Sequence, residues 1–477
     1  MLISPMAVHA GSIFVDVNGD GEVNIADVNA VIDYILSGQS ESPIDLEKNY
    51  LSAKEFGAVG DGETDDTEAL ETLFEAAFML KKAVYFDPGT YLIRRSLPLR
   101  SGMEIYGGEE TYLRKQVAMV ASLTEPAVKG QTYVVLNTVS GLKVGDQFVI
   151  VDNAGANQCT NGIVTAIDGY RVSFTNVISD QQSDFPGCIK DYDAGAKVSN
   201  SFALLRSWSS RFECDGVYIH DLTLYGSRRN SEPRVWSNSC IHMDSYYPGG
   251  YTGNTGIEYR NVQRDMVVSN VVIINSPCDG ISDQGEGGLI VRDCVIENSA
   301  MHGVHLGTKY SNAIIANNTM TGNGTAGAGV FFCQEVNNVF VDNNTITSFN
   351  HGCSDQEFGT AARDVTVRNN VFSNINSTVF DFMMATSNFH GSGLQISNNQ
   401  IVNLKSTLFG GKYLDNVIIS DNVVKNVLQQ PQHVISVTQS RNVVISGNTL
   451  VPLVSTGDAV DSTETVNLIQ DANSWNN

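Results

Sequence analysis

The octapeptide VFVDNNTI, residues 339–346, recurs in altered form through the second half of the chain. Its other copies are IIANNTM (314–320), VTVRNNVF (365–372), LQISNNQI (394–401), VIISDNVV (417–424) and VVISGNTL (443–450). The last asparagines of the six copies lie 26, 26, 29, 23 and 26 residues apart, at Asn318, Asn344, Asn370, Asn399, Asn422 and Asn448. A repeat of about 20–50 residues indicates stacked structural units.

Apolar and polar residues alternate around each asparagine, which is the period of a β-strand. Three short strands and three turns fit a coil of this length, so the repeat predicts an all-β parallel β-helix solenoid. A turn asparagine in the left-handed conformation can bond its equivalents in the coils above and below, and we predict such an asparagine ladder. Earlier coils give the same position to Leu222, Val271 and Cys294, and the 49-residue gap between the first two indicates an insertion.

The residues before the repeats predict a capping helix. In FGAVGDGETDDTEAL (56–70), Thr64 or Asp65 can cap a helix over about 66–81 with one apolar face. A strand, a turn and a strand follow in VYFDPGTYLI (84–93). This opening resembles the N-terminal cap of the pectate-lyase-like, right-handed parallel β-helix proteins, a group of polysaccharide lyases and glycoside hydrolases that includes phage tailspikes. The resemblance extends over about residues 50–455 and implies a right-handed solenoid with an active cleft on one strand face.

Five segments follow from these patterns. Residues 1–12 are expected to be a signal-peptide remnant or disordered, and residues 13–40 hold a calcium segment. We assign 50–116 to the cap and first coils, 117–200 to a small inserted β subdomain with glycine turns, and 201–477 to the main β-helix with its cleft loops.

The composition limits the partners. The chain has 477 residues and a formal net charge of −23, which disfavours nucleic acid and anionic membrane surfaces. No apolar run approaches the roughly 20 residues of a membrane span. The start MLISPMAVHA resembles the end of a signal peptide, so we expect a bacterial type of export to the periplasm, cell surface or medium. The eight cysteines contain no CxxC pair, which argues against a zinc ribbon, and we expect no organic cofactor.

The stretch DVNGDGEVNIAD, residues 16–27, has the oxygen-ligand spacing of an EF-type calcium loop, with Gly21 at the sharp turn. The predicted ligands are Asp16, Asn18, Asp20, the carbonyl of Glu22, Asn24 and Asp27. A helical pattern follows and ends at Gly38. Loop and helix resemble one half of a dockerin, which implies structural calcium and a possible cohesin-like partner.

The strands that follow the ladder loops predict a polar face. They read SCIHMD (239–244), DGISDQ (279–284), HGVHLG (302–307), AGVFFC (328–333) and HGCSDQ (351–356). By alternation one outward column holds His242, Ser282, His305, Phe331 and Ser354, and the next holds Asp244, Gln284, Gly307, Cys333 and Gln356. The loops add His302, Lys309, Glu335 and His351. Exposed polar side chains on a rigid sheet are typical of a binding groove.

Two insertions are expected beside this face. YGSRRNSEPRVW (225–236) brings Arg228, Arg229 and Arg234, and SYYPGGYTGNTGIEYR (245–260) brings tyrosines that include Tyr246. Aromatic rings stack on sugars, and arginine binds a carboxylate or sulfate with two hydrogen bonds. We therefore predict that Arg228, Arg229, Arg234, Gln284, His302, Glu335, His351 and Gln356 bind substrate.

Three classes of function fit these residues. The first is a lyase that cleaves an acidic polysaccharide, such as a glycosaminoglycan or pectin, by β-elimination; its catalytic candidates are His242, His305, Tyr246, Lys309 and Asp244. The second is a glycoside hydrolase with paired carboxylates, Asp283 with Asp355 or Asp244 with Glu335. Asp283 and Asp355 have the inward parity, which weakens that pair. The third is a non-catalytic glycan-binding solenoid.

Overall fold

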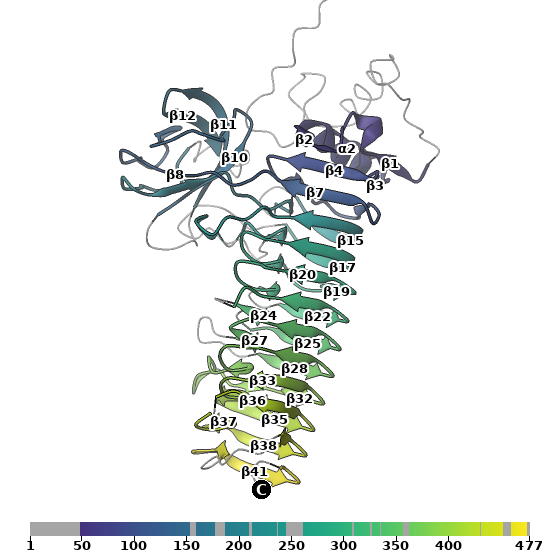
Figure 1. Cartoon of the computed structure of the whole chain (residues 1–477), viewed down its shortest axis with the longest axis vertical. Helices are drawn as coiled ribbons and strands as arrows, with labels where there is room; N and C mark the ends of the chain where they lie inside the picture. The colour runs from purple at the N-terminus through teal and green to yellow at the C-terminus, as the bar shows by residue number, and fades with distance from the viewer. Residues whose placement is uncertain are drawn as a thin grey trace, which may run out of the picture. The chain divides into compact units, whose positions relative to one another are not determined.

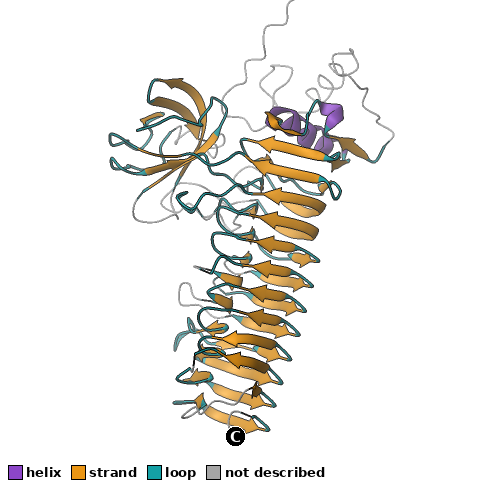
Figure 2. Ribbon diagram, viewed as in Figure 1, coloured by secondary structure: helices purple, strands orange, loops and turns teal. Residues whose placement is uncertain are grey.

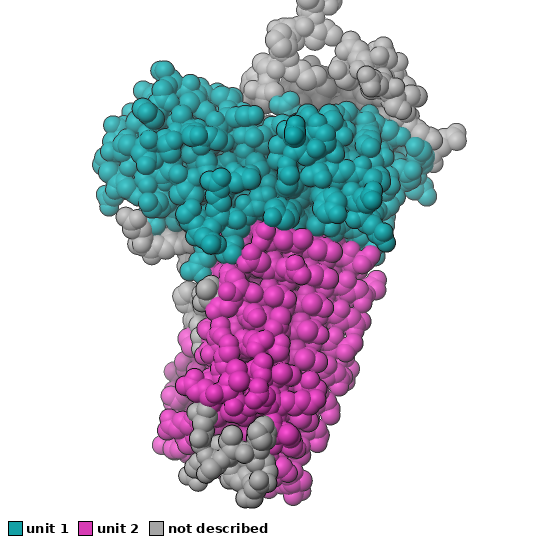
Figure 3. Space-filling view, in the orientation of Figure 1, with its two compact units in different colours: residues 1–263 teal, residues 264–477 magenta. Residues whose placement is uncertain are grey.

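The computed structural model describes residues 48–152, 159–176, 187–208, 212–235, 237–244, 261–307, 310–324, 327–333, 335–355, 362–429, 431–451 and 459–474. The chain divides into two compact units, residues 1–263 and 264–477, which Figure 3 colours separately. Among the described residues, no helix has the length and hydrophobicity that a membrane span requires.

The first unit begins with a cap. The 3-10 helix η2 (Lys54–Phe56) and the helix α2 (Thr67–Leu80) accompany its first strands, and Leu70, Leu73 and Phe74 of α2 are buried. The N-cap of α2 is Asp66 rather than the predicted Thr64 or Asp65, and its side chain makes no capping hydrogen bond. Asp65 Oδ1 accepts a hydrogen bond from the Thr67 N–H (3.1 Å). The carboxylate of Asp66 instead accepts the backbone N–H groups of Val59 and Gly60.

Parallel strands form the coils of the first unit. One row contains β1 (Tyr50–Ser52), β3 (Ala83–Tyr85) and β6 (Glu104–Tyr106), and a second contains β2 (Asp61–Asp65), β4 (Gly89–Ile93) and β7 (Thr111–Lys115). The long strand β15 (Cys214–Tyr225) pairs with both β6 and β7. A third row contains β5 (Leu97–Pro98), β14 (Leu205–Arg206) and β16 (Ile241–Met243).

An antiparallel sheet is inserted between β7 and β14. Its strand order is β8 (Val120–Ser122), β13 (Lys197–Ser199), β10 (Gln147–Val151), β11 (Thr160–Asp168), β12 (Arg171–Asn176) and β9 (Tyr133–Val135). It has its own apolar core around Phe148, Phe174 and Tyr192. We call this element the inserted sheet.

The second unit is a stack of parallel coils, as the orange strands in Figure 2 show. One row runs β17 (Gln263–Ile274), β19 (Ile290–Arg292), β22 (Ser311–Ala316), β25 (Asn337–Asp342), β28 (Arg363–Arg368), β31 (Gly391–Ser392) with β32 (Gln395–Ser397), β35 (Leu414–Ser420), β38 (Arg441–Ser446) and β41 (Val466–Asp471). The next row runs from the end of β17 through β20 (Val295–Glu297), β23 (Thr319–Thr321), β26 (Thr345–Thr347), β29 (Val371–Ser373), β33 (Gln400–Leu404), β36 (Val423–Val427) and β39 (Thr449–Val451).

The third row of this unit, which we call the site sheet, carries the polar strands. It runs β18 (Ile281–Asp283), β21 (Val304–Leu306), β24 (Ala328–Phe332), β27 (His351–Ser354), β30 (Phe380–Phe382), β34 (Phe409–Lys412), β37 (Ile435–Thr438) and β40 (Val460–Asp461). Phe332, Phe382 and Phe409 stack in the interior behind it. The parallel β-helix predicted from the repeats is confirmed.

The asparagine ladder lies in the turn between the first two rows, where successive strands such as β22, β25 and β28 lie side by side in Figure 1. Each ladder side chain accepts the backbone N–H and the amide hydrogen of the previous one: Asn318 donates both to Asn344 Oδ1, and Asn344 donates both to Asn370 Oδ1 (2.8–2.9 Å). Asn448 bonds Asn473 in the same way, so the ladder continues one coil further than the predicted six.

The conformation predicted for the ladder residue is wrong by one position. The residue before it has positive φ: Asn317, Asn343, Asn369, Asn398, Asp421 and Gly447. Asparagine, aspartate and glycine tolerate that region best. The exposed residue therefore makes the turn, while the buried ladder residue supplies the hydrogen bonds. Cys294 occupies the ladder position of an earlier coil, as predicted, because its N–H donates to Asn318 Oδ1.

The cysteines are packing residues in most cases, as expected. Six of the eight are buried: Cys188, Cys214, Cys240, Cys278, Cys294 and Cys353.

Candidate functional site

A column of side chains runs across the site sheet. The strand register places Ser282 beside His305, His305 beside Phe331, and Phe331 beside Ser354, which confirms the alignment made from the sequence. The next strand adds Asp381 beside Ser354. In the first unit, His242 lies in register with Arg206.

The prediction that this face is exposed is wrong for the first outward column, whose side chains are all buried, whereas Gln284 and Cys333 of the second column are partly exposed. His305, Phe331 and Asp381 are each 3–4% exposed. The rings of His302, His305 and Phe331 bury one another in part. The ring of His302 stacks on Phe331 with centroids 4.1 Å apart, and His305 meets the same ring edge to face at 4.9 Å. The face is therefore a set of packed polar clusters.

The first cluster contains Asp279, His302 and His305, all buried. Asp279 Oδ2 lies 3.0 Å from His305 Nδ1, and Asp279 Oδ1 accepts the backbone N–H of His302 at 3.0 Å. Burial lowers the pKa of His305, but the Asp279 carboxylate outweighs it and raises this pKa to about 10. At neutral pH His305 is therefore an imidazolium paired with Asp279.

The same three side chains have the composition of a metal site, with candidate ligand atoms within 4.8 Å of one another. The hydrogen positions on these side chains do not fit a metal site. The N–H of Ala328 donates to His302 Nδ1 (2.9 Å), so the neutral ring carries its hydrogen on Nε2. A metal needs a nitrogen without hydrogen, and both ring positions of His302 are thereby committed. The cluster presents hydrogen-bond donors and positive charge.

The second cluster contains Asp355, Asp381 and His351. Asp355 is 2% exposed, its N–H donates to the Asp381 carbonyl (3.0 Å), and neither carboxylate oxygen of Asp355 has a hydrogen-bond partner in the described part of the chain. Burial, together with the charge of Asp381, raises the pKa of Asp355 well above its usual value. His351 Nδ1 lies 3.4 Å from Asp381 Oδ2. Asp355 is thus a buried carboxyl group whose ionisation is opposed by the neighbouring Asp381.

Asp283, the predicted partner of Asp355 in one hydrolase pair, has a different environment. It is fully buried, accepts the Tyr310 hydroxyl hydrogen (2.8 Å) and the Gly285 N–H (2.9 Å), and Tyr310 also accepts the Leu289 N–H. Burial raises the pKa of Asp283 to about 7. Its inward parity is therefore confirmed, and its contacts belong to the interior of the solenoid.

A third cluster lies in the first unit around His242. Asp244 Oδ1 is 3.7 Å from His242 Nε2 and 3.9 Å from an Arg206 nitrogen, and the Asp244 N–H donates to Ser207 Oγ. Arg206 lies over the ring of Trp208, 4.0 Å from its centroid. All these side chains except Asp244 are nearly inaccessible.

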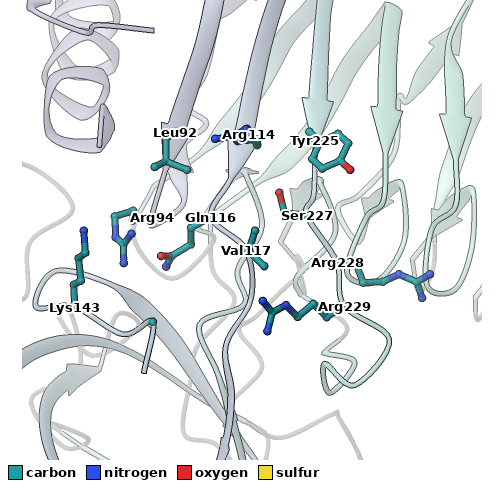
Figure 4. A pocket seen from close by; sticks show the side chains of 11 residues that line it. Leu92, Arg94, Arg114, Gln116, Val117, Lys143, Tyr225, Ser227, Arg228 and Arg229 are labelled. Atoms are coloured by element: carbon teal, nitrogen blue, oxygen red, sulfur yellow. The ribbon is translucent and has the colours of Figure 1, made fainter. Parts of the chain in front are cut away.

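A cavity of about 580 Å³ opens in the first unit beside the inserted sheet. Its lining residues are Leu92, Arg94, Arg114, Gln116, Val117, Gly141, Lys143, Tyr225, Ser227, Arg228 and Arg229. Figure 4 shows Arg94 and Lys143 on one side of the space and Arg229 on the other. We call it the basic cleft, because five of its lining side chains are cationic and none is acidic.

Two family models match parts of this chain. "Rhamnogalacturonase A/epimerase, pectate lyase-like" matches residues 50–134, and "Right handed beta helix region" matches residues 255–413. The cap resemblance inferred from the sequence is thus supported by a pectate-lyase-like match, and the solenoid by a β-helix match.

Three known proteins are similar to the chain. The K30/K69-specific capsule depolymerase of Klebsiella phage K5-2 is 22% identical over 315 residues, which are 62% of this chain and 35% of the depolymerase. The chain spans well under half the length of the curated relatives it matches. The exopolygalacturonase of Thermotoga maritima has a TM-score of 0.52 at 13% identity, covering 93% of this chain and 96% of that one. The Streptococcus pneumoniae surface adhesin PfbA has a TM-score of 0.50 at 13% identity, covering 84% of each chain. The two structural likenesses show the fold.

The structure separates the predicted site residues. His302 and His305 share one cluster, His351 belongs to another, and Gln284 donates to Ser282 on the site sheet. Glu335 is exposed in a turn with positive φ. His242 and Asp244 lie in the first unit. Of the three arginines predicted to bind substrate, Arg228 and Arg229 line the basic cleft, and Arg234 does not. Tyr246, Lys309, Gln356 and the six calcium ligands lie outside the described residues, so their roles stay predictions.

Several residues of these clusters were missed by the sequence analysis. Asp381 was detectable, because one further coil of the same alignment reads VFDF (379–382) and places it after Ser354. Asp279 precedes its strand, so alternation could not assign it. Arg94, Arg114 and Lys143 come from distant segments and carry no local motif.

Proposed function

We propose that this protein is a carbohydrate-active enzyme that cleaves an acidic, uronate-containing polysaccharide at the site sheet. The observation that carries the proposal is the pair of neighbouring carboxyl groups, Asp355 and Asp381, of which the first has a strongly raised pKa. Such a pair can divide the roles of acid and base between chemically identical groups. The matches to a rhamnogalacturonase/epimerase model and to a capsule depolymerase support a polysaccharide substrate.

Hydrolysis is the reaction that this pair favours. Asp355, whose pKa is raised, would serve as the general acid that donates a proton to the glycosidic oxygen as the bond to the sugar breaks. Asp381 would serve as the carboxylate that activates water or attacks the sugar. His351 Nδ1 lies 3.4 Å from Asp381 Oδ2 and 2.9 Å from the Thr378 carbonyl oxygen. The likeness in fold to an exopolygalacturonase is consistent with this reaction.

β-Elimination is a second candidate, favoured by the charged His305. Elimination removes the proton beside a uronate carboxylate and needs a cation to neutralise that carboxylate. His305 can supply the charge and His302 an N–H donor. His305 itself is a poor base at neutral pH, because it is already protonated, so the role first expected for it changes from base to charge neutralisation. The base would be another group, such as Tyr246 or Lys309.

One assay separates these reactions. Purified protein is incubated with polygalacturonate, alginate, a glycosaminoglycan and a neutral glucan, and both reducing ends and the ultraviolet absorbance of unsaturated uronate are followed. We expect new reducing ends from an acidic polymer without that absorbance. Reducing ends accompanied by the absorbance would replace hydrolysis with elimination. Binding without any new ends would favour a glycan-binding solenoid, the class to which the adhesin likeness draws attention.

Matched variants assign the residues. Asp355→Asn and Asp381→Asn should each lower kcat at least a hundredfold, the lower range of general acid–base catalysis. Asp421→Asn is the control, because it makes the same chemical change at an exposed turn position where other coils carry asparagine. If Asp355→Asn keeps wild-type activity while folding normally, the carboxyl-pair mechanism is wrong.

We also propose that the enzyme acts outside the cytoplasm. The signal-like start of the sequence supports this, and a polymeric substrate would be met there. Fractionation of cells that express the full gene tests it; retention of the protein with cytoplasmic markers would refute it.

A further inference from the structure

The basic cleft differs from the rest of the chain in charge. The whole protein carries a net charge of −23, yet five cationic side chains and no acidic one line this single space. They come from separate parts of the first unit. Arg94 follows β4, Arg114 belongs to β7, Arg228 and Arg229 follow β15, and Lys143 precedes β10 of the inserted sheet. The fold therefore gathers them, although the sequence does not.

Internal partners neutralise only part of this charge. Arg94 makes two hydrogen bonds to the buried Asp146 (2.5 and 2.8 Å), and Arg114 donates to the Gly62 carbonyl, which carries no net charge. The side chains of Lys143 and Arg229 make no ion pair with any residue that the structure describes. Burial lowers the pKa of Arg228, which shows that its charge is partly desolvated.

Two buried polar atoms also line the cleft. Gln116 is 5% exposed and Ser227 is 6% exposed, and the Gln116 Nε2 and Ser227 Oγ atoms have no hydrogen-bond partner within the described ranges. An unbonded buried polar group costs about 1–3 kcal/mol, so such groups usually have a partner. Gln116 and Ser227 line the same cavity as Lys143 and Arg229, where an anion with hydroxyl groups would satisfy them.

The backbone on both sides of the basic cleft is fixed by buried carboxylates. Glu232 accepts the backbone N–H of Arg229 (3.2 Å) and forms an ion pair with the buried Lys115 (3.0 Å). On the other side, Asp146 accepts the backbone N–H of Lys143 (2.8 Å) while it binds Arg94. Both positive side chains thus project from fixed backbone, which lowers the entropy cost of binding a ligand.

We propose that the basic cleft is a binding site for an acidic oligosaccharide segment, which it holds through carboxylate or sulfate groups, separate from the clusters of the site sheet. Its volume is within the range of about 300–1,000 Å³ for small-molecule sites, so it suits a few sugar units. Lys143 and Arg229 meet the charged groups, and Gln116 and Ser227 bond the sugar hydroxyls. The inserted sheet supplies one wall of this site. The inference does not depend on cleavage at the site sheet.

Calorimetry with defined probes tests this site. The probes are a galacturonate tetrasaccharide, its methyl ester, a sulfated chondroitin tetrasaccharide and inorganic sulfate. We expect one or both acidic tetrasaccharides to bind, with affinity that falls as salt rises, and the methyl ester and inorganic sulfate to bind at least tenfold more weakly. Equal binding of the methyl ester would overturn the proposal, and equal binding of inorganic sulfate would reduce the cleft to a simple anion site.

The location is tested by paired variants. The double variant Lys143→Gln, Arg229→Gln should weaken binding by roughly tenfold or more, because it removes two charge-assisted contacts. Arg234→Gln removes an exposed arginine from the same loop that does not line the cleft, and it should leave the affinity within about twofold. If both variants weaken binding equally, the effect is only general charge.

Binding at the cleft and cleavage at the site sheet can fail separately. Asp355→Asn should abolish cleavage and leave the calorimetric affinity unchanged. The Lys143→Gln, Arg229→Gln variant should lose affinity for the acidic tetrasaccharides. Its kcat on short neutral or singly charged substrates that the wild type cleaves should be unchanged. Loss of binding in Asp355→Asn would place the ligand at the site sheet and refute the cleft.

Discussion

Removing the amide of Asn344 is expected to weaken the solenoid without changing any of the three polar clusters. In the native chain Asn344 Oδ1 accepts two hydrogen bonds from Asn318, and Asn344 Nδ2 donates to the Ile315 carbonyl (2.8 Å) and to Asn370 Oδ1 (2.9 Å). Asn344→Ala deletes all of these at a position that is 1% exposed, where water cannot replace them.

The size of the destabilisation depends on which polar groups lose all of their hydrogen-bond partners. The Nδ2 group of Asn318 keeps its bond to the Val291 carbonyl, and Asn370 Oδ1 keeps the backbone N–H of residue 344. The N–H of Asn318 loses Asn344 Oδ1 as its acceptor and is left buried, which costs about 1–3 kcal/mol. The other lost bonds contribute about 0.5–1.5 kcal/mol each. Three such bonds are lost, so we expect the free energy of unfolding to fall by about 2.5–7.5 kcal/mol.

The matched control changes the neighbouring residue. Asn343 is exposed, has φ of 54° and donates to Asn317 Oδ1 (2.8 Å) at the surface. Asn343→Gly removes this exposed bond and keeps the left-handed turn, so we expect a change below about 1 kcal/mol. Urea unfolding followed by circular dichroism measures both variants, and amide hydrogen exchange should rise in the coils next to residue 344. Equal shifts for the two variants, or no shift for Asn344→Ala, would refute the ladder argument.

Three further predictions concern charge and metal. His305→Gln leaves Asp279 as a buried, uncompensated charge and should lower the free energy of unfolding by about 3–5 kcal/mol near pH 6. The stabilisation by His305 is complete below its unfolded pKa of about 6.5 and is lost as the pH rises through about 10, so the difference between variant and wild type should narrow in denaturation measured up to pH 10. A constant difference would contradict the pairing. The pKa of Asp283 in the folded state is raised to about 7, so its protonated form favours the folded state. The wild-type free energy of unfolding should therefore fall by roughly 4 kcal/mol from pH 4 to 7 because of this group, and Asp283→Asn should lack that fall. Parallel pH curves for variant and wild type would show that Asp283 does not titrate in this range. We also propose calcium in the loop at residues 16–27, to be tested by calorimetry of the whole chain, with Asp20→Ala abolishing binding of one ion and an unchanged stoichiometry counting against the loop.

The sequence predicted the stacked coils and their length because one residue type, asparagine, repeats at a fixed structural position. Asn318 and Asn344 marked the coil length, and strand alternation then aligned His305 with Phe331 correctly. The left-handed residue was placed one position too late, since two neighbouring asparagines are equally suited to a tight turn. Burial of the second one decides between them, and burial depends on the coils above and below.

The polar clusters were less predictable for the same reason. His305 was assigned to the correct column, but its charge depends on Asp279, which lies 26 residues away in sequence and belongs to no strand. Asp355 had the inward parity by alternation, yet strand β27 ends at Ser354, so alternation no longer applies to it. The charge of the basic cleft depends on the meeting of Arg94, Lys143 and Arg229, which no local pattern encodes.

The strand register of the site sheet sets fixed distances between its side chains, so the solenoid can act as a ruler for a bound glycan. His305 and Asp381 lie three strands apart in one column, and neighbouring strands are about 4.8 Å apart, so the two positions are separated by roughly 14 Å. Each coil bonds only its neighbours, and Asn318, Asn344 and Asn370 are spaced by 26 residues each. Excising residues 319–344 would rejoin Asn318 to Thr345 in the same sequence context and shorten the ruler by one step. A glycan that contacts both clusters must match this spacing, and its length preference should change with each coil removed or duplicated.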